Sequence, residues 1–261
     1  MKKLFCFIFS FFILTGCSNI STNENAIMNV STQNLYDKKQ GWGFKKIEGE
    51  SPQFTKEQIE TMEKYNCIYL GKDEKSIYLT FDEGYENGYT APILDVLKKH
   101  GVPAAFFITG DYFEKNEDLI KRMLDEGHIV GNHTLNHPSL PDKSAEEIQN
   151  ETEGLNDKFY KKFGIKMKYV RPPMGEYSEK SLEITKNLGY ANVFWSFAYK
   201  DWEVDNQKGK ENTLSQIKRF LHGGAVILLH AVSKDNAEAM EEIITYARKM
   251  GFEFKSLDEY K

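Results

Sequence analysis

Two short runs carry the side chains best suited to catalysis. The run TFDEG places Asp82 and Glu83 where an apolar segment ends, and the run HTLNH offers His133 and His137 on a spacing of four. A hydrolytic metal centre needs two or three protein ligands, and a carboxylate outside the metal shell that takes a proton from water. Either run alone is weak evidence, because adjacent acids are common at strand ends and paired histidines occur by chance. Together, inside a repeating strand–helix pattern, they indicate an enzyme.

The elements that must position these side chains alternate regularly. Apolar segments separated by amphipathic helical stretches predict a parallel α/β sheet, and the length of 261 residues favours a closed or nearly closed barrel. Seven segments have the strand pattern: 76–81, 103–108, 128–132, 168–171, 191–197, 225–230 and 252–256. Barrel enzymes build their active sites at the carboxyl ends of such strands. The side chains predicted at those ends are Asp82, Glu83, His133, Arg171, Asp201 and His230.

The N-terminal residues have the pattern of an export signal. Two lysines precede an apolar run at 4–14 that is too short for a comfortable membrane span, and the sequence LTGC at its end resembles a bacterial lipobox. We therefore expect residues 1–17 to be a lipoprotein signal whose Cys17 carries the lipid, which places the protein at the outer face of a membrane. The alternative is an ordinary cleaved signal peptide in which Cys17 is incidental.

The rest of the chain divides by composition. Residues 18–40 are rich in Ser, Thr and Asn and are expected to form a tether. Residues 41–74 form an N-terminal extension, whose Trp42-Gly43-Phe44 could pack on the domain, and residues 75–261 form the catalytic domain. The net charge of −5 gives no sign of a nucleic-acid partner. Cys67 would be the one cysteine of the folded domain, so an intrachain disulfide there is excluded; an exported protein without disulfides fits a Gram-positive surface.

Five sequence motifs occur in the order found in one known family. They are TFDEG, HTLNH, RPPMG, DW and LLH, which begin at residues 80, 133, 171, 201 and 228. Over residues 76–260 the chain resembles the polysaccharide deacetylases of the NodB-homology type, carbohydrate esterase family 4. The resemblance implies a deformed (β/α)7 barrel. The sequences YENG at 85–88 and WGFKK at 42–46 resemble one branch, the delta-lactam-forming N-acetylmuramic acid deacetylases of spore cortex, and so imply a spore-forming bacterium.

The resemblance implies a role for each matched polar residue. Asp82 would be the general base that activates water, and Arg171 would keep it ionised and oriented. His230 would be the general acid that protonates the leaving amine, and Asp201 would orient its ring and raise its pKa.

The resemblance also implies a metal and a substrate-binding wall. His133 and His137 would be metal ligands, with Glu83 at the third ligand position, where the family usually has Asp. A Glu can still ligate, but its carboxylate lies one methylene further out. A divalent metal is expected, with Zn²⁺ as the default. The remaining roles are an oxyanion contact from the backbone N–H of Tyr85, a pocket wall from Trp202 and Leu228, and a groove shaped by Pro173.

The expected function is hydrolysis of an N-acetyl group on a cell-wall glycan. The most specific form of this hypothesis is muramic acid in peptide-stripped peptidoglycan, on the route to the muramic delta-lactam of spore cortex. One alternative is a peptidoglycan N-acetylglucosamine deacetylase. Another is a surface protein that binds glycan without catalysis. The complete polar set described above argues against the last alternative, because a binding protein has no need of all its members.

Overall fold

The computed structural model describes residues 36–260. The predicted signal at 1–17, the lipid on Cys17 and most of the tether at 18–40 lie outside the described residues, so those predictions are not tested by it. Among residues 36–260, no helix combines the length and the apolar character needed to cross a membrane.

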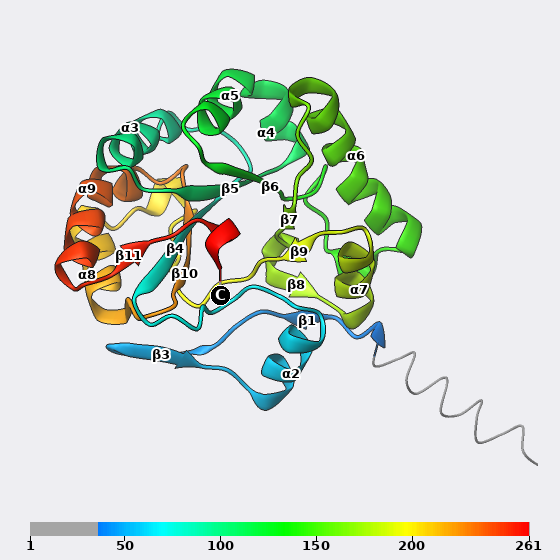
Figure 1. Ribbon diagram of the computed structural model, residues 1–261, viewed down its shortest axis with the longest axis horizontal. Coiled ribbons are helices and arrows are strands. Elements are labelled where there is room, and N and C mark those ends of the chain that lie inside the picture. The colour runs from blue at the N-terminus through cyan, green and yellow to red at the C-terminus, as the bar shows by residue number, and fades with distance from the viewer. Residues whose placement is uncertain (1–35, 261) are drawn as a thin grey trace, which may run out of the picture. The chain divides into compact units, whose positions relative to one another are not determined.

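A seven-stranded parallel sheet forms the centre of the domain (Figure 1). Its path runs β10–β4–β5–β6–β7–β9, and β11 pairs with the first residues of β4. A parallel bridge between Phe197 and Ile227 joins the chain after β9 to β10, so the sheet curves back on itself. The predicted α/β barrel is confirmed. The strands are β4 (Ser76–Glu83), β5 (Ala104–Ile108), β6 (Ile129–Asn132), β7 (Tyr169–Val170), β9 (Ala191–Asn192), β10 (Val226–His230) and β11 (Glu253–Phe254).

Helices surround the sheet on its outer side (Figure 1). Their amphipathic sequences direct apolar side chains to the strands, and their ends follow local signals. The helix α6 begins after Ser144, whose side chain forms a capping box with Glu147. The helices are α3 (Thr90–His100), α4 (Gly110–Lys115), α5 (Glu117–Asp125), α6 (Ala145–Phe163), α7 (Glu179–Asn187), α8 (Lys210–Phe220) and α9 (Lys234–Lys249).

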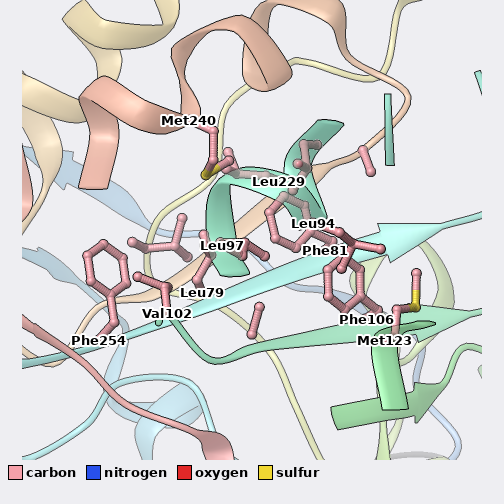
Figure 2. Packing of buried hydrophobic residues seen from close by; sticks show 14 of the residues in the cluster. Leu79, Phe81, Leu94, Leu97, Val102, Phe106, Met123, Leu229, Met240 and Phe254 are labelled. Atoms are coloured by element: carbon pink, nitrogen blue, oxygen red, sulfur yellow. The ribbon is translucent and has the colours of Figure 1, made fainter. Parts of the chain in front are cut away.

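The strand β4 is buried along its whole length, and its alternate residues face different cores. Leu79 and Phe81 point outward and pack under the helices, in the cluster that Figure 2 shows around Leu94 of α3. Tyr78 belongs to an inner cluster with Phe107 of β5 and Val226 of β10. Even-numbered positions of β4 therefore face the inside of the barrel, and odd-numbered positions face the helix layer.

The N-terminal extension packs against the barrel through aromatic side chains. The indole of Trp42 lies 4.9 Å from the ring of Phe194 and 5.2 Å from that of Phe54, measured between ring centroids. Its backbone N–H donates to Gly175 O at 2.8 Å and its indole N–H to Trp195 O at 2.7 Å. The predicted packing of this segment is confirmed. The extension contains β1 (Gln40–Gly41), β2 (Lys45–Ile47), β3 (Glu50–Gln53) and α2 (Lys56–Lys64), and β1 pairs with β8 (Glu176–Tyr177).

Candidate active site

A hollow of about 470 Å³ lies at the carboxyl ends of the strands. In the parallel register of β4 and β10, Asp82 is paired with His230, so both side chains reach the hollow from neighbouring strands. His133 directly follows β6, and Arg171 directly follows β7. The structure thus brings together all the predicted polar residues except one, Glu83. The residues that line the hollow are Asp82, Gly84, Tyr85, His133, His137, Met174, Gly175, Trp195, Trp202, Leu228, His230 and Val232.

Asp82 is held by a fully buried arginine. The Arg171 Nη1 donates to Asp82 Oδ1 at 2.7 Å, and its Nη2 donates to Thr80 Oγ1 at 2.8 Å. The guanidinium carbon also lies 4.2 Å from the centre of the Phe107 ring. Burial alone would raise the pKa of the Asp82 carboxyl, but the charge of Arg171 outweighs it and holds that pKa below its usual value. Asp82 is therefore ionised at neutral pH.

The two imidazoles of HTLNH lie beside this carboxylate. His133 Nδ1 is 2.8 Å from Arg171 O; a carbonyl only accepts, so this nitrogen carries the proton. The other ring nitrogen of His133, Nε2, therefore carries a lone pair, and it lies 3.5 Å from Asp82 Oδ2. The ring of His137 is 4.7 Å from that of His133, between centroids. Burial lowers the pKa of His133 to about 4 and lowers that of His137 as well, so both rings are neutral and can act as ligands.

Glu83 lies on the opposite face of β4 from Asp82. Its side chain is fully buried, and within the described part of the chain neither carboxyl oxygen has a hydrogen-bond partner. Burial raises its pKa well above the ordinary value, and the nearby acids Glu86 and Asp82 add to the effect. Burial raises the pKa of the Tyr112 hydroxyl, and the nearby Glu83 carboxyl adds to that rise. Tyr112 belongs to the hydrophobic cluster that packs between the strands and the helices.

The predicted three-ligand metal set is not assembled in this structure. Within residues 36–260, no group of three or more His, Cys, Asp or Glu side chains is arranged to hold a metal ion. His133 and His137 would supply two nitrogen ligands, but the alternation of β4 directs Glu83 away from them. The predicted set of Glu83, His133 and His137 thus does not fit a three-ligand site.

A second pair of interacting titratable side chains, besides Arg171 with Asp82, is His230 with Asp201. His230 Nδ1–H donates to Asp201 Oδ1 at 2.7 Å, and the backbone N–H of His230 donates to Oδ2 at 2.8 Å. Burial would lower the pKa of His230, but the adjacent Asp201 carboxylate outweighs burial and raises it. The imidazole is therefore fixed in one orientation, with Nε2 left for the hollow that His230 lines.

The predicted substrate-binding residues divide into two groups. Tyr85, Trp202 and Leu228 line the hollow; Tyr85 is 47% exposed and Trp202 50% exposed, so neither is core packing. The Trp202 ring centroid lies 5.5 Å from that of His230. Pro173 is buried in the turn η2 (Pro173–Gly175), and the next two residues of that turn contribute to the lining instead.

Several contributors to the site were not predicted from the sequence. Thr80 belongs to the TFDEG motif without a predicted role of its own, and it accepts a hydrogen bond from Arg171 Nη2. Met174 and Trp195 line the hollow, and Asn236 donates to Asp201 Oδ2 at 2.6 Å. For Thr80 the signal was available, because alternation places it on the same strand face as Asp82. An asparagine in a predicted helix gives no such signal.

A second hollow, of about 530 Å³, adjoins the first. The two share Gly84, Tyr85 and His137, and the second extends toward Asn136 and Lys158. The recessed surface beside Asp82 and His230 therefore extends beyond the first hollow.

The comparison with known proteins decides the family. The model of the polysaccharide deacetylase family matches residues 70–193. The chain is 50% identical, over 221 residues and 84% of each sequence, to the peptidoglycan-N-acetylmuramic acid deacetylase PdaA of Bacillus subtilis. The chain belongs to the polysaccharide deacetylase family. The resemblance stated from its motifs is confirmed.

Other members of the polysaccharide deacetylase family share its fold. The structure of Bacillus subtilis PdaA, a family 4 carbohydrate esterase, matches with a TM-score of 0.83 at 48% identity, over 86% of this chain and 97% of that one. A family 4 carbohydrate esterase from Bacillus anthracis matches with a TM-score of 0.73 at 43% identity, over 86% and 96%. A peptidoglycan-N-acetylglucosamine deacetylase of Bacillus cereus is 33% identical over 202 residues, which cover 75% of this chain and 72% of that protein.

Proposed function

We propose that this chain removes the N-acetyl group from muramic acid in peptidoglycan whose stem peptide has been removed. One observation carries the proposal: an ionised Asp82 and a His230 with a raised pKa face one hollow from strands paired in register. A base that is charged and an acid that is protonated at the same pH are what hydrolysis of an amide requires.

The proposed reaction uses this pair in two steps. Asp82 accepts a proton from water as the water oxygen attacks the acetyl carbonyl carbon. The C–N bond then breaks, and His230 Nε2–H gives its proton to the leaving amine, so that acetate and a free amine are the products. Arg171 keeps Asp82 ionised, and Asp201 keeps the imidazole protonated on the side that faces away from the hollow. The backbone N–H of Tyr85 would stabilise the oxyanion.

A divalent metal, Zn²⁺ by default, is part of the proposal. Deacetylases of this family are generally metal-dependent. His133 and His137 would hold the ion, which would supply Lewis-acid activation of water and carbonyl. Since Glu83 does not lie with the imidazoles, the steps above are assigned to protein groups alone.

The choice of sugar rests on the comparison with named relatives. The identity of 50% to a protein named as an N-acetylmuramic acid deacetylase exceeds the 33% to a protein named for N-acetylglucosamine. The two adjoining hollows offer room for a glycan strand rather than an isolated acetamide, as both the muramic acid and the glucosamine readings require. In peptide-free muramic acid the lactyl carboxyl is free, so the amine released by deacetylation can close on it to form the delta-lactam of spore cortex.

The proposal includes attachment to a membrane. The lipobox sequence supports an exported lipoprotein held by a lipid on Cys17, at the outer face of a bacterial membrane, with residues 18–40 as the tether to its peptidoglycan substrate. Labelled fatty acid should be incorporated into the full chain in a bacterial host and not into Cys17→Ser. Equal labelling of both would contradict the anchor.

The function is tested by mass spectrometry of glycan treated with the purified domain. Peptide-free strands, strands with stem peptides and N-acetylglucosamine oligomers are incubated in parallel and digested. We expect muramic acid in peptide-free strands to lose the mass of one acetyl group exchanged for hydrogen, with a further loss of water if the lactam closes. Loss from glucosamine alone would contradict the proposal and favour the glucosamine deacetylase. Binding to the strands without any loss would favour a non-catalytic protein.

A further inference from the structure

Asn236 is a buried polar residue to which the reaction above gives no role. It lies in the first turn of α9, and its side chain is fully buried. Its Nδ2 donates to Asp201 Oδ2 at 2.6 Å and to the backbone carbonyl of His230 at 3.1 Å. The side-chain amide of Asn236 thus contacts both Asp201 and His230.

The orientation of this amide is determined by its neighbours. The hydroxyl of Tyr199 donates to Asn236 Oδ1 and is also hydrogen-bonded to Thr213 Oγ1, at 2.8 Å. A carboxylate only accepts and a hydroxyl can donate, so the oxygen of the amide must face Tyr199 and its nitrogen must face Asp201. The backbone N–H of Asn236 also donates to Ser233 Oγ at 3.2 Å, which fixes the residue to the start of the helix.

The hydrogen bonds to Asp201 show what the amide contributes. Asp201 Oδ1 accepts from the imidazole of His230, and Oδ2 accepts from the backbone N–H of His230 and from Asn236. Without Asn236, Asp201 Oδ2 would accept only from the backbone N–H of His230. Both remaining donors to the carboxylate would then belong to His230, which is the residue that Asp201 must orient. The carboxylate could then turn about its own bond to Cβ. Asn236 is the contact that ties it to a different element of the fold.

We propose that Asn236 is a positioning residue for His230, acting through Asp201, and that Tyr199 fixes the direction of its amide. The inference rests on the proposed function only in its effect on turnover. The hydrogen bond between His230 and Asp201 can be measured in the absence of any substrate.

The test compares Asn236→Leu with Tyr199→Phe. Leucine keeps the size of the side chain and removes the amide, whereas phenylalanine keeps the ring and removes the hydroxyl. We expect the downfield proton resonance of the His230 Nδ1–H to shift or broaden in both variants. With peptide-free glycan as substrate, kcat should fall about 10- to 100-fold in Asn236→Leu with KM unchanged, as for other partners that orient a reacting group. The fall in Tyr199→Phe should be smaller.

A matched control separates positioning from general loss of packing. Asn156 is also a buried asparagine on a helix, and its Oδ1 accepts from Met167 N at 3.0 Å, outside the site. Asn156→Leu should lower the melting temperature while the His230 resonance and kcat remain unchanged. The inference would be overturned if Asn236→Leu folds and both its His230 resonance and its kcat equal those of the wild type. If that variant does not fold, unchanged readouts in Tyr199→Phe would overturn it.

Failure of the inference can be told apart from failure of the proposed function. If the wild type releases no acetate from any glycan, the proposed function fails. The resonance of His230 in the variants would still decide whether Asn236 orients the acid pair.

Discussion

Asp82 and Glu83 are consecutive, both are buried carboxyl groups, and the barrel gives them opposite surroundings. Asp82 faces inward to Arg171, and the guanidinium more than offsets the cost of burying its charge. Glu83 faces the helix layer, where burial, Glu86 and Asp82 all oppose ionisation. One side of a strand therefore holds an anion beside a reaction hollow, and the other side holds a carboxyl that favours its neutral form.

The difference shows that position on a strand decides chemistry more strongly than residue type does. Burial penalises a charge unless a partner is supplied, and a strand supplies different partners to its two faces. The imidazoles of His133 and His137 lie on the side of Asp82. We expect substitutions of the two acids to have effects that differ in size and in kind.

The largest effect is expected for Asp82→Asn. The amide cannot take a proton from water, so turnover on peptide-free glycan should fall by roughly 10²- to 10⁴-fold, the usual contribution of a positioned base. The far-ultraviolet circular dichroism spectrum should match that of the wild type. Turnover close to that of the wild type in a folded variant would show that Asp82 is not the base.

A smaller loss is expected for Asp201→Asn, together with a change in pH dependence. The Asp201 carboxylate raises the pKa of His230, which burial would otherwise lower. The neutral amide removes that support, so the pKa of His230 should fall and the acid should lose its proton at lower pH. The alkaline limb of the kcat profile should move to lower pH, with kcat reduced about 10- to 100-fold. If the alkaline limb stays at the pH of the wild type, Asp201 does not raise the pKa of His230.

Metal binding extends the comparison from the two acids to the two imidazoles. We expect His137→Ala to weaken Zn²⁺ binding by more than the roughly 10- to 100-fold typical of changes outside the ligand shell. Glu83→Gln should leave the affinity unchanged, because this side chain lies on the other strand face. Isothermal titration of protein freed of metal by a chelator measures both. An equal loss in the two variants would return Glu83 to the ligand set.

The smallest predicted effect is a change in the free energy of unfolding of Glu83→Gln. The folded-state pKa of Glu83 lies well above its ordinary value of 4.5, so the folded protein retains a proton that the unfolded chain releases as pH rises. Glu83 therefore lowers stability increasingly as the pH rises above 4.5. The amide of Gln binds no proton in either state, so the variant should gain stability relative to the wild type as the pH rises from 4.5 to neutral. Urea unfolding at acidic and neutral pH should show this gap opening with pH.

The sequence predicted the barrel and the residues at its strand ends, because alternating apolar and amphipathic segments determine both. It did not show that β4 continues through Glu83, because the predicted strand ends at residue 81 and alternation separates neighbouring side chains only within a strand. Every residue of β4 is buried, so hydrophobic periodicity does not distinguish the inner face from the outer one. The predicted strand at 191–197 is too long, since only Ala191–Asn192 pairs regularly and, beyond it, only Val193 and Phe197 make isolated bridges. Asn236 was missed because its role depends on tertiary contacts alone.

The central claim is that Asp82 acts as the base while its neighbour takes no part in the chemistry. Release of acetate from one preparation of peptide-free glycan, measured side by side for Asp82→Asn and Glu83→Gln, tests it most directly. The account predicts that Glu83→Gln releases acetate at the rate of the wild type and that Asp82→Asn releases almost none. Loss of acetate release in Glu83→Gln with its fold intact would contradict it.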